Sequence, residues 1–321
     1  MNIVIITPAP KGSRSGNRAS ANRWAAIFRN LGHKVKVLTE YSGEDTDFMV
    51  ALHAWRSANS IKKFSEMHPD LPLVVVLTGT DAYRFINTHK KTTTDSLKVA
   101  TIIVGINHLI KNILPKEYLS KLRVIVQSAK PNLNRRPLKR LFNVCFAGHL
   151  REEKDPETLF EAIRELPKIS KIKVNAYGKA HSKKWEKIAI DEMKKNDRFQ
   201  WHGEISHANL RNKFSSSHLL ISTSIMEGGA NVISEAIMAD LPIIASDIDG
   251  NIGLLGQDYP GYFKVKNAKS LKDKLLQIET NPKSYNDLIR KCISLKSNFK
   301  PENEMSGWKK LITEALKIKN N

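Results

Sequence analysis

The sequence has little cysteine and no long apolar segment. Its 321 residues include only Cys145 and Cys292, each within an apolar or amphipathic segment and without a partner motif. We therefore expect reduced packing thiols in a cytoplasmic protein, and no cysteine and histidine spacing typical of zinc is present. No apolar run approaches the roughly 18 residues of a membrane-spanning helix. Residues 1–8 lack the basic start of a signal peptide, so they predict a first strand.

Acidic residues are also scarce relative to basic ones. The chain has 52 Lys and Arg against 32 Asp and Glu, a net charge of +20 and a pI near 9.8. Such charge suits nucleic acid, an anionic membrane or an anionic substrate. The basic residues are scattered, however, and the sequence has no RNP-like aromatic run and no arginine-rich tail. These features argue against a nucleic-acid partner.

The apolar pattern alternates short β-branched runs with amphipathic stretches, which predicts an α/β protein with parallel sheets. Its length favours two doubly wound domains, residues 1–130 and 142–298, joined by a proline-containing basic linker at 131–141 and followed by a helical segment at 299–321. The predicted strands are residues 2–7, 34–38, 48–52, 73–77, 101–104, 124–127, 143–147, 172–177, 199–201, 218–222, 241–245 and 261–265. The predicted helices are residues 18–31, 57–67, 107–113, 156–166, 183–193, 207–214, 230–239, 271–278, 285–295 and 302–318. Folds of this kind bind ligands at the carboxyl ends of their strands.

One glycine turn follows a buried strand and precedes a helix. Residues 226–235 read Met-Glu-Gly-Gly-Ala-Asn-Val-Ile-Ser-Glu. Free amides at a helix start attract phosphate, and glycine permits its close approach. Glu227 and Glu235 flank this turn, and a carboxylate beside a phosphate needs hydroxyls or cations to contact, such as sugar hydroxyls. Two glutamates on a surface helix can equally be solvated.

The turn after the first predicted strand is rich in cations. Residues 8–18 read Pro-Ala-Pro-Lys-Gly-Ser-Arg-Ser-Gly-Asn-Arg, which is neither a dinucleotide nor a Walker fingerprint. Backbone amides and guanidinium groups here can cradle an oxyanion, although a disordered basic surface loop is the alternative. The candidate residues of this cradle are Lys11, Gly12, Ser13, Arg14, Gly16, Asn17 and Arg18.

Three further turns follow strands and carry polar side chains. Residues 148–156 contain Arg151 and Lys154, either diphosphate contacts or a solvated helix start. Residues 52–57 and 77–84 add His53, Arg56, Thr80, Asp81 and Arg84 at the rim of the N-terminal half. A lone histidine after a strand is more often structural than a base.

We expect no metal and no cofactor. Asp45-Thr-Asp47 and Asp247-Ile-Asp249 spell Asp-x-Asp, which binds Mg²⁺ for nucleotide sugars in another fold, but both patterns are short and common. Residues 250–253, Gly-Asn-Ile-Gly, suggest a turn. No Gly-x-Ser-x-Gly elbow supports a hydrolase.

Residues 227–235 resemble the Glu-x7-Glu motif of retaining GT-B glycosyltransferases of the glycogen-synthase-like group. Gly148-His-Leu-Arg-Glu-Glu-Lys154 is similar to the Gly-Arg-Leu-x-x-Glu-Lys segment of that group. The resemblance implies two Rossmann-like domains facing across a cleft, with the final helix crossing back to the N-terminal domain. Donor contacts are implied for Glu235, for Lys154 on the diphosphate, and for Glu227 with the following Gly228, Gly229, Ala230 and Asn231. His149 stands where that group usually has arginine, and the charge of Arg151 could substitute.

A closer resemblance, to the selenosugar synthase (SenB-like) family, covers nearly the whole chain. It lies in residues 8–18, 23–25, 31–33, 52–58, 77–81, 148–156, 226–235 and 250–262. It implies transfer from a UDP-sugar, UDP-N-acetylglucosamine or UDP-glucose, to selenophosphate for selenoneine biosynthesis, with a selenophosphate-supplying enzyme as a partner. The 8–18 turn, Arg56, Thr80 and Asp81 would then bind the acceptor, and His53, Arg151, Lys154 and Glu227 would serve catalysis.

Two other functions compete with this one. An ordinary GT-B enzyme would glycosylate a hydroxyl of a lipid or polysaccharide at a membrane surface, which the basic composition suits. A non-catalytic nucleic-acid or nucleotide-binding protein would show steep salt dependence.

Overall fold

The computed structural model describes residues 1–132, 135–137 and 140–320, and it confirms the predicted α/β class. Two compact units are present. The first comprises Met1–Gln127, Glu227–Ala230 and Pro301–Asn321, and the second comprises Ser128–Met226 and Asn231–Lys300. Part of the predicted linker, residues 133–134 and 138–139, lies outside the described residues. Its Arg135 packs on the second unit, where Nη2 donates to the His218 carbonyl at 3.1 Å.

The first unit is built on a parallel six-stranded sheet with strand order β2-β1-β3-β4-β5-β6. Its strands are β1 (Asn2–Ile6), β2 (Lys34–Leu38), β3 (Phe48–Leu52), β4 (Leu73–Leu77), β5 (Ile102–Gly105) and β6 (Leu122–Val124). Every residue of β3 and β4 is buried, as expected for central strands covered on both faces. The carboxyl ends of all six strands lie at one edge.

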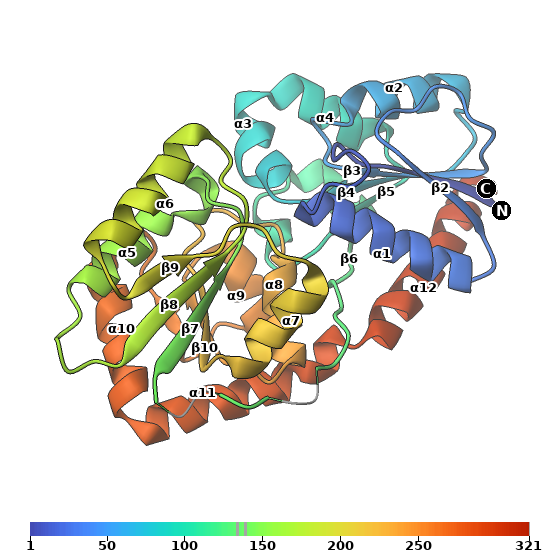
Figure 1. Ribbon diagram of the computed structural model, residues 1–321. Coiled ribbons are helices and arrows are strands. Elements are labelled where there is room, and N and C mark those ends of the chain that lie inside the picture. The colour runs from blue at the N-terminus through green and yellow to red at the C-terminus, as the bar shows by residue number, and fades with distance from the viewer. Residues whose placement is uncertain (133–134, 138–139, 321) are drawn as a thin grey trace. The chain divides into compact units, whose positions relative to one another are not determined.

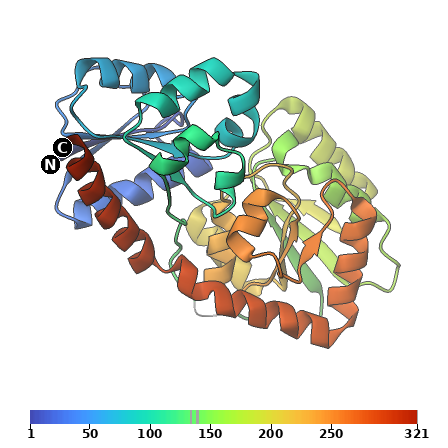
Figure 2. The same ribbon diagram turned by 180° about the vertical axis from the view of Figure 1, so that it is seen from behind.

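Helices cover both faces of this sheet (Figures 1 and 2). They are α1 (Gly16–Asn30), α2 (Ala58–Met67), α3 (Ile86–Thr88), α4 (Lys90–Val99) and α12 (Pro301–Asn320), with a π-helical turn at Asp81–Phe85. Ile3 and Ile5 of β1 share one apolar cluster with α1 and α12, whereas Val4 and Ile6 share another with α2 and α4. The alternation of side chains along a strand therefore divides this core into two layers.

The helix α12 is held on α1 by aromatic and charged contacts. Trp308 packs against Trp24 with ring centroids 5.0 Å apart. The buried Glu304 carboxylate accepts a hydrogen bond from Trp24 Nε1 at 2.7 Å and lies 3.1 Å from Arg23 Nε. These contacts join segments some 280 residues apart in sequence.

The second unit repeats the architecture, with strand order β12-β11-β10-β7-β8-β9, all parallel. Its strands are β7 (Phe142–Ala147), β8 (Ile172–Tyr177), β9 (Phe199–Trp201), β10 (Leu219–Ser222), β11 (Ile243–Ser246) and β12 (Tyr262–Phe263). Its helices are α5 (Pro156–Arg164), α6 (Lys183–Lys195), α7 (His207–Ser216), α8 (Asn231–Met238), α9 (Asp249–Leu255), α10 (Ala268–Thr280) and α11 (Pro282–Leu295).

Four local predictions differ from the structure. The strand expected at 124–127 lies at Leu122–Val124. The helix expected at 107–113 is reduced to a 3₁₀ turn at Ile110–Asn112, because Asn107 Oδ1 accepts the Leu109 amide and competes with helical bonding. Residues 250–253 form part of α9 instead of a turn. The helical stretch from Asp81 to Val99 was missed. No helix in the described ranges combines the length and hydropathy needed to span a bilayer.

Candidate functional site

The cation-rich turn after β1 is an ordered loop. Ser13 donates its amide to the Pro10 carbonyl at 3.1 Å, and Ser15 donates its amide to Ser13 Oγ at 3.1 Å. Gly12 has a φ of 87°, in the left-handed region that glycine adopts at little cost. Ser15 caps α1 by accepting the Arg18 amide at 3.5 Å. These bonds argue against a disordered loop, and the predicted cradle residues lie together at the start of α1.

The three cations of this turn differ in burial. Lys11 and Arg14 are exposed, whereas Arg18 retains only 8% of its accessible surface. The Arg18 Nε is buried without a hydrogen-bond partner among the residues that the structure describes. A buried N–H donor without an acceptor is costly. An anion bound beside it would remove that cost.

Asp81 organises the turn after β4. Its carboxylate accepts hydrogen bonds from three amides, those of Thr78 at 2.9 Å, Gly79 at 2.8 Å and Ala54 at 3.0 Å. The side chain is fully buried. It therefore ties the turns after β3 and β4 together, a role that differs from the acceptor contact expected from the sequence.

His53 also lies inside this edge of the sheet. It is 1% exposed and has a φ of 74°. Its Nδ1 accepts the Arg56 amide at 3.1 Å, and its Nε2 lies 3.0 Å from Thr80 Oγ1. Burial lowers the pKa of the imidazole, although nearby Asp81 opposes this shift. Both ring nitrogens of His53 contact other groups of the protein, so this geometry does not provide the direct catalytic contact expected from the sequence. Arg56 itself is exposed.

The Glu227–Ala230 loop belongs to the first unit by its contacts. A Cβ added at Gly228 would lie 2.5 Å from the Thr78 carbonyl oxygen, and one at Gly229 would lie 2.7 Å from the Ile106 carbonyl oxygen. The side-chain amide of Asn107 donates to the Gly228 carbonyl. Close packing against the backbone of the first unit therefore requires glycine at both positions. This reason is separate from the close approach of a phosphate that the sequence suggests. The sequence gives no sign that Asn107 belongs to this site, because its contact with Gly228 joins residues 121 positions apart.

In the second unit, the loop after β7 carries Lys154 and Arg151. The side chain of Lys154 lies along Gly148, where an added Cβ would be 3.3 Å from its Cε. Thr223 Oγ1 donates to the Lys154 carbonyl at 2.6 Å, which ties this loop to the segment after β10. Arg151 Nε lies 3.7 Å from Glu153 Oε2. The loop therefore holds two cations at the carboxyl edge of this sheet.

His149 is held in one tautomer. Its Nδ1 accepts the Lys179 amide at 3.1 Å, so the neutral ring carries its proton on Nε2. Burial lowers the pKa of this imidazole, with Glu204 opposing and the cations of Arg151 and Lys154 adding to the effect. His149 therefore offers a neutral donor where the resembling group has a permanent charge.

Glu235 lies in the second turn of α8. Its Oε1 is 3.8 Å from His207 Nδ1, and 22% of its side chain remains exposed. Asn231, the first residue of α8, accepts a hydrogen bond from Ser234 Oγ through its carbonyl at 2.9 Å. The exposed part of the Glu235 carboxylate can accept hydrogen bonds from ligand hydroxyls.

Three of the four Asp-x-Asp carboxylates accept hydrogen bonds from the backbone or a neighbouring side chain. Asp47 accepts the Asn2 amide at 2.7 Å, Asp45 accepts the Asn2 side chain at 3.0 Å, and Asp247 accepts the Val265 amide at 2.8 Å. Within the described ranges, no group of three or more His, Cys, Asp or Glu side chains is placed to hold a metal ion.

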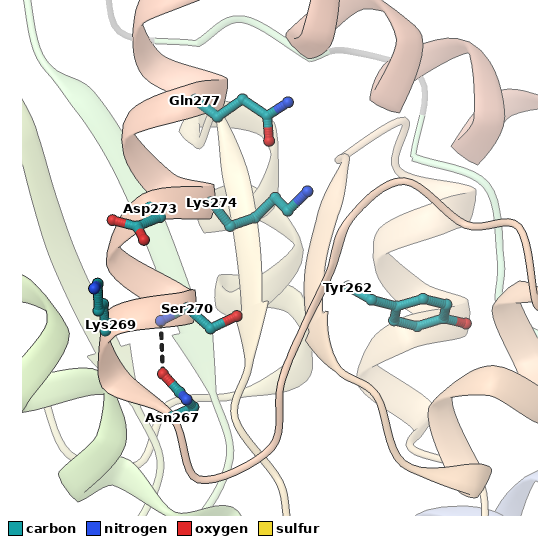
Figure 3. Close-up of a pocket in the computed structure, with 7 residues that line it drawn as sticks. All are labelled: Tyr262, Asn267, Lys269, Ser270, Asp273, Lys274 and Gln277. Carbon is teal, nitrogen blue, oxygen red and sulfur yellow. Dashed lines mark hydrogen bonds between the residues drawn. The ribbon is translucent and has the colours of Figure 1, made fainter.

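A shallow pocket of about 500 Å³ lies elsewhere on the second unit (Figure 3). It is lined by Tyr262, Asn267, Lys269, Ser270, Asp273, Lys274 and Gln277. Asn267 caps α10 by accepting the Ser270 amide at 2.8 Å, and Lys274 Nζ donates to the Pro260 carbonyl at 3.1 Å. These bonds are structural, and none of the predicted site residues is among those lining the pocket.

Comparison with known proteins identifies the architecture. A family model described as "Glycosyl transferases group 1" matches residues 133–293, just over half of the chain. No curated protein matches the chain in sequence. Among solved structures, HepE from Anabaena in complex with UDP and glucose has a TM-score of 0.78 at 12% identity, covering 98% of this chain and 100% of that one.

Two other structures are similar over the same length. Sucrose-phosphate synthase from Thermosynechococcus elongatus has a TM-score of 0.77 at 14% identity, and a glycosyltransferase from Rickettsia africae has 0.73 at 16%. Each match covers 98% of both chains. Likeness at these identities shows the fold, and the predicted GT-B class is confirmed.

Proposed function

This chain belongs to the glycosyl transferase group 1 family, and from that premise we propose that it moves the sugar of a UDP-sugar onto selenophosphate. The product is a selenosugar with a carbon–selenium bond, as selenoneine biosynthesis requires. UDP-N-acetylglucosamine and UDP-glucose are the candidate donors. The observation that carries the acceptor half of the proposal is the buried Nε of Arg18, in an ordered turn with two further cations, which has no hydrogen-bond partner in the part of the chain that the structure describes.

The donor half is supported by the second unit. Lys154 and Arg151 supply positive charge at the carboxyl edge of its sheet, and the partly exposed Glu235 suits ribose hydroxyls. The similar HepE structures hold UDP, glucose or UDP-glucose. The Nε2–H of His149 would donate to the donor diphosphate without adding charge.

The acceptor half is supported by the chemistry of the turn after β1. Selenophosphate is a compact, multiply charged anion whose unprotonated phosphoryl oxygens only accept hydrogen bonds. Lys11, Arg14 and Arg18, with the amides of the turn, supply donors and positive charge. A small cationic turn of this kind suits a compact anion better than a bulky lipid or polysaccharide hydroxyl.

The reaction needs positioning and charge stabilisation more than proton transfer. The selenium lone pair attacks the anomeric carbon, and the bond from that carbon to the UDP oxygen breaks, leaving the electron pair on the diphosphate. The phosphoryl group stays on selenium until water hydrolyses the selenium–phosphorus bond, which releases orthophosphate and the selenosugar. Selenium is already anionic at neutral pH, so no strong general base is required. Arg151 and Lys154 would stabilise the departing UDP.

The test is to incubate the protein with selenophosphate and each UDP-sugar. We expect UDP release and a product whose mass spectrum carries both the hexose and the selenium isotope pattern. Release of UDP only with a lipid or polysaccharide acceptor would support the hydroxyl-transfer alternative. No release with any UDP-sugar would end the proposal.

Matched variants separate the two halves. Glu235→Gln should raise the KM for the UDP-sugar and leave the KM for selenophosphate nearly unchanged. Arg18→Met should do the reverse. Orthophosphate in place of selenophosphate is the control for the nucleophile, because it presents the same oxygens without selenium.

A further inference from the structure

The hydroxyl of Thr80 is held on one side by the imidazole of His53. Its Oγ1 lies 3.0 Å from His53 Nε2. Among the described residues no partner accepts its own proton. The side chain is partly exposed and follows β4, at the carboxyl edge of the first sheet.

The direction of the His53–Thr80 bond follows from the other ring nitrogen. His53 Nδ1 accepts the Arg56 amide at 3.1 Å, which places the proton of a neutral ring on Nε2. Nε2 therefore donates to Thr80 Oγ1. The hydroxyl proton of Thr80 is then directed away from His53.

The surroundings of His53 favour the neutral ring. Burial and the Arg56 cation lower its pKa, whereas the Asp81 carboxylate and a backbone hydrogen bond oppose this shift. The rings of Trp55 and Phe85, with centroids 6.3 and 5.8 Å from that of His53, also lie beside it and add no charge. The backbone amide of Arg56 thus fixes the tautomer of His53, and His53 in turn fixes the direction of the Thr80 hydroxyl.

We propose that Thr80 donates this hydrogen bond to a phosphoryl oxygen of the acceptor anion, with His53 as the positioning residue that fixes its direction. The inference rests on the proposed function and names a residue pair within its acceptor site. A sugar hydroxyl both donates and accepts, so it has no need of a donor held in one direction. An anion oxygen only accepts, and a preset donor suits it.

The topology of the sheet places this donor near the cationic turn. Thr80 follows β4, His53 follows β3, and the turn containing Arg18 follows β1, and these strands are neighbours in the order β1-β3-β4. Adjacent strands lie about 4.8 Å apart, so β1 and β4 are separated by about 10 Å. An anion of a few ångströms can contact groups from both turns.

Variants of Thr80 and His53 test this pair of hydrogen bonds, from His53 to Thr80 and from Thr80 to the anion, which we call the relay. Thr80→Val keeps the shape and removes the hydroxyl, and it should raise the KM for selenophosphate about 10- to 100-fold. Thr80→Ser should restore it to within about threefold. His53→Asn tolerates the positive φ and can still accept the Arg56 amide, but it cannot reach Thr80, and a rise of about 3- to 10-fold is expected. Thr94→Val, at an exposed hydroxyl on α4 that bonds the Lys90 carbonyl, is the control.

The double variant is decisive. If His53 acts through Thr80, His53→Asn should add less than about twofold to the effect of Thr80→Val. The KM for the UDP-sugar should stay within about twofold in all variants. Additive effects, or an equal rise in both KM values, would show a merely structural role and overturn the proposal.

Two readouts need no turnover and separate this inference from the proposed function. Nitrogen-15 NMR of the imidazole should show the proton of His53 on Nε2, and a proton on Nδ1 would refute the relay. Calorimetry with inorganic phosphate should show binding that Thr80→Val weakens about tenfold or more. Absent or unchanged phosphate binding refutes the relay, whereas a wild-type protein that binds phosphate but releases no UDP refutes only the proposed function.

Discussion

Replacing Arg18 by methionine should make the protein more stable and a worse enzyme. The Arg18 Nε is buried and has no hydrogen-bond partner within residues 1–132, 135–137 and 140–320, and the residue is 8% exposed. A buried N–H donor without an acceptor costs about 1–3 kcal/mol, and a methionine of similar length keeps part of the packing of its stem. We expect the free energy of unfolding to rise by about 1–3 kcal/mol without ligand.

The same substitution removes the charge that the acceptor would pair with. Loss of one partner from a desolvated charge pair costs about 2–5 kcal/mol of binding, which is roughly 30-fold to several thousand-fold in the acceptor KM. Opposite signs on stability and binding distinguish a ligand-binding arginine from a structural one. Excess selenophosphate should therefore stabilise the wild type and leave the variant nearly unaffected.

The assay combines urea unfolding with UDP-release kinetics for both proteins. Arg29→Met is the matched control, because Arg29 lies on the same helix, is exposed, and donates to the Val35 carbonyl at 2.8 Å. It should change stability by less than about 1 kcal/mol and leave both KM values alone. If Arg18→Met lowers stability and keeps the acceptor KM within twofold, the guanidinium is structural and the acceptor site lies elsewhere.

Three further predictions concern stability and are all measurable by urea unfolding. Glu304→Ala should lower the free energy of unfolding by about 3 kcal/mol, since it leaves the buried Trp24 Nε1–H without its acceptor at 2.7 Å; a loss below 1 kcal/mol would contradict this. Gly228→Ala should cost about 1–3 kcal/mol because its Cβ would meet the Thr78 backbone at 2.5 Å. By contrast Gly307→Ala, in mid-helix, would place its Cβ at an ordinary contact distance of 3.6 Å from Ile125 Cγ1 and should gain about 0.5–1 kcal/mol; equal effects at the two glycines would refute this explanation. Burial lowers the pKa of His53 below its unfolded value of about 6.5, so stability should be complete above that pH and fall as acid titrates the unfolded chain first. A His53→Asn variant should show a smaller loss between pH 7.5 and about 5.5, and a flat wild-type profile would count against the buried neutral ring.

The strands could be predicted because their signal is local. Phe48–Leu52 and Leu73–Leu77 are continuous apolar runs between polar turns, and the structure has the predicted bounds at both. The α4 helix at Lys90–Val99 was missed because its Lys-Lys-Thr-Thr-Thr start is polar and β-branched, which weakens the helical signal. Its burial depends on only a few residues, Leu97 among them.

The site was harder to predict because its roles depend on distant contacts. Cationic side chains after β1 and β7 are visible in the sequence as candidates for binding anions. Nothing local distinguishes Arg18 from Arg14, since only the folded chain shows that one is buried and the other exposed. Likewise the partners of Asp81 include the Ala54 amide, 27 residues earlier in the chain.

The turns after β3 and β4 lie at the carboxyl edge of the first sheet. Three of their residues, Asp81, His53 and Thr80, have different roles there. The Asp81 carboxylate, which the sequence suggests as a ligand contact, accepts hydrogen bonds from three backbone amides and fixes the turn. That fixed turn holds Thr80 opposite an imidazole whose direction the Arg56 amide sets. A negative charge facing the acceptor would repel an anion, so burying Asp81 beneath the turn leaves a neutral hydroxyl and exposed cations at the surface. If Asp81 were exposed, the same residues would favour a neutral or cationic acceptor. The burial of this one carboxylate therefore favours an anionic acceptor.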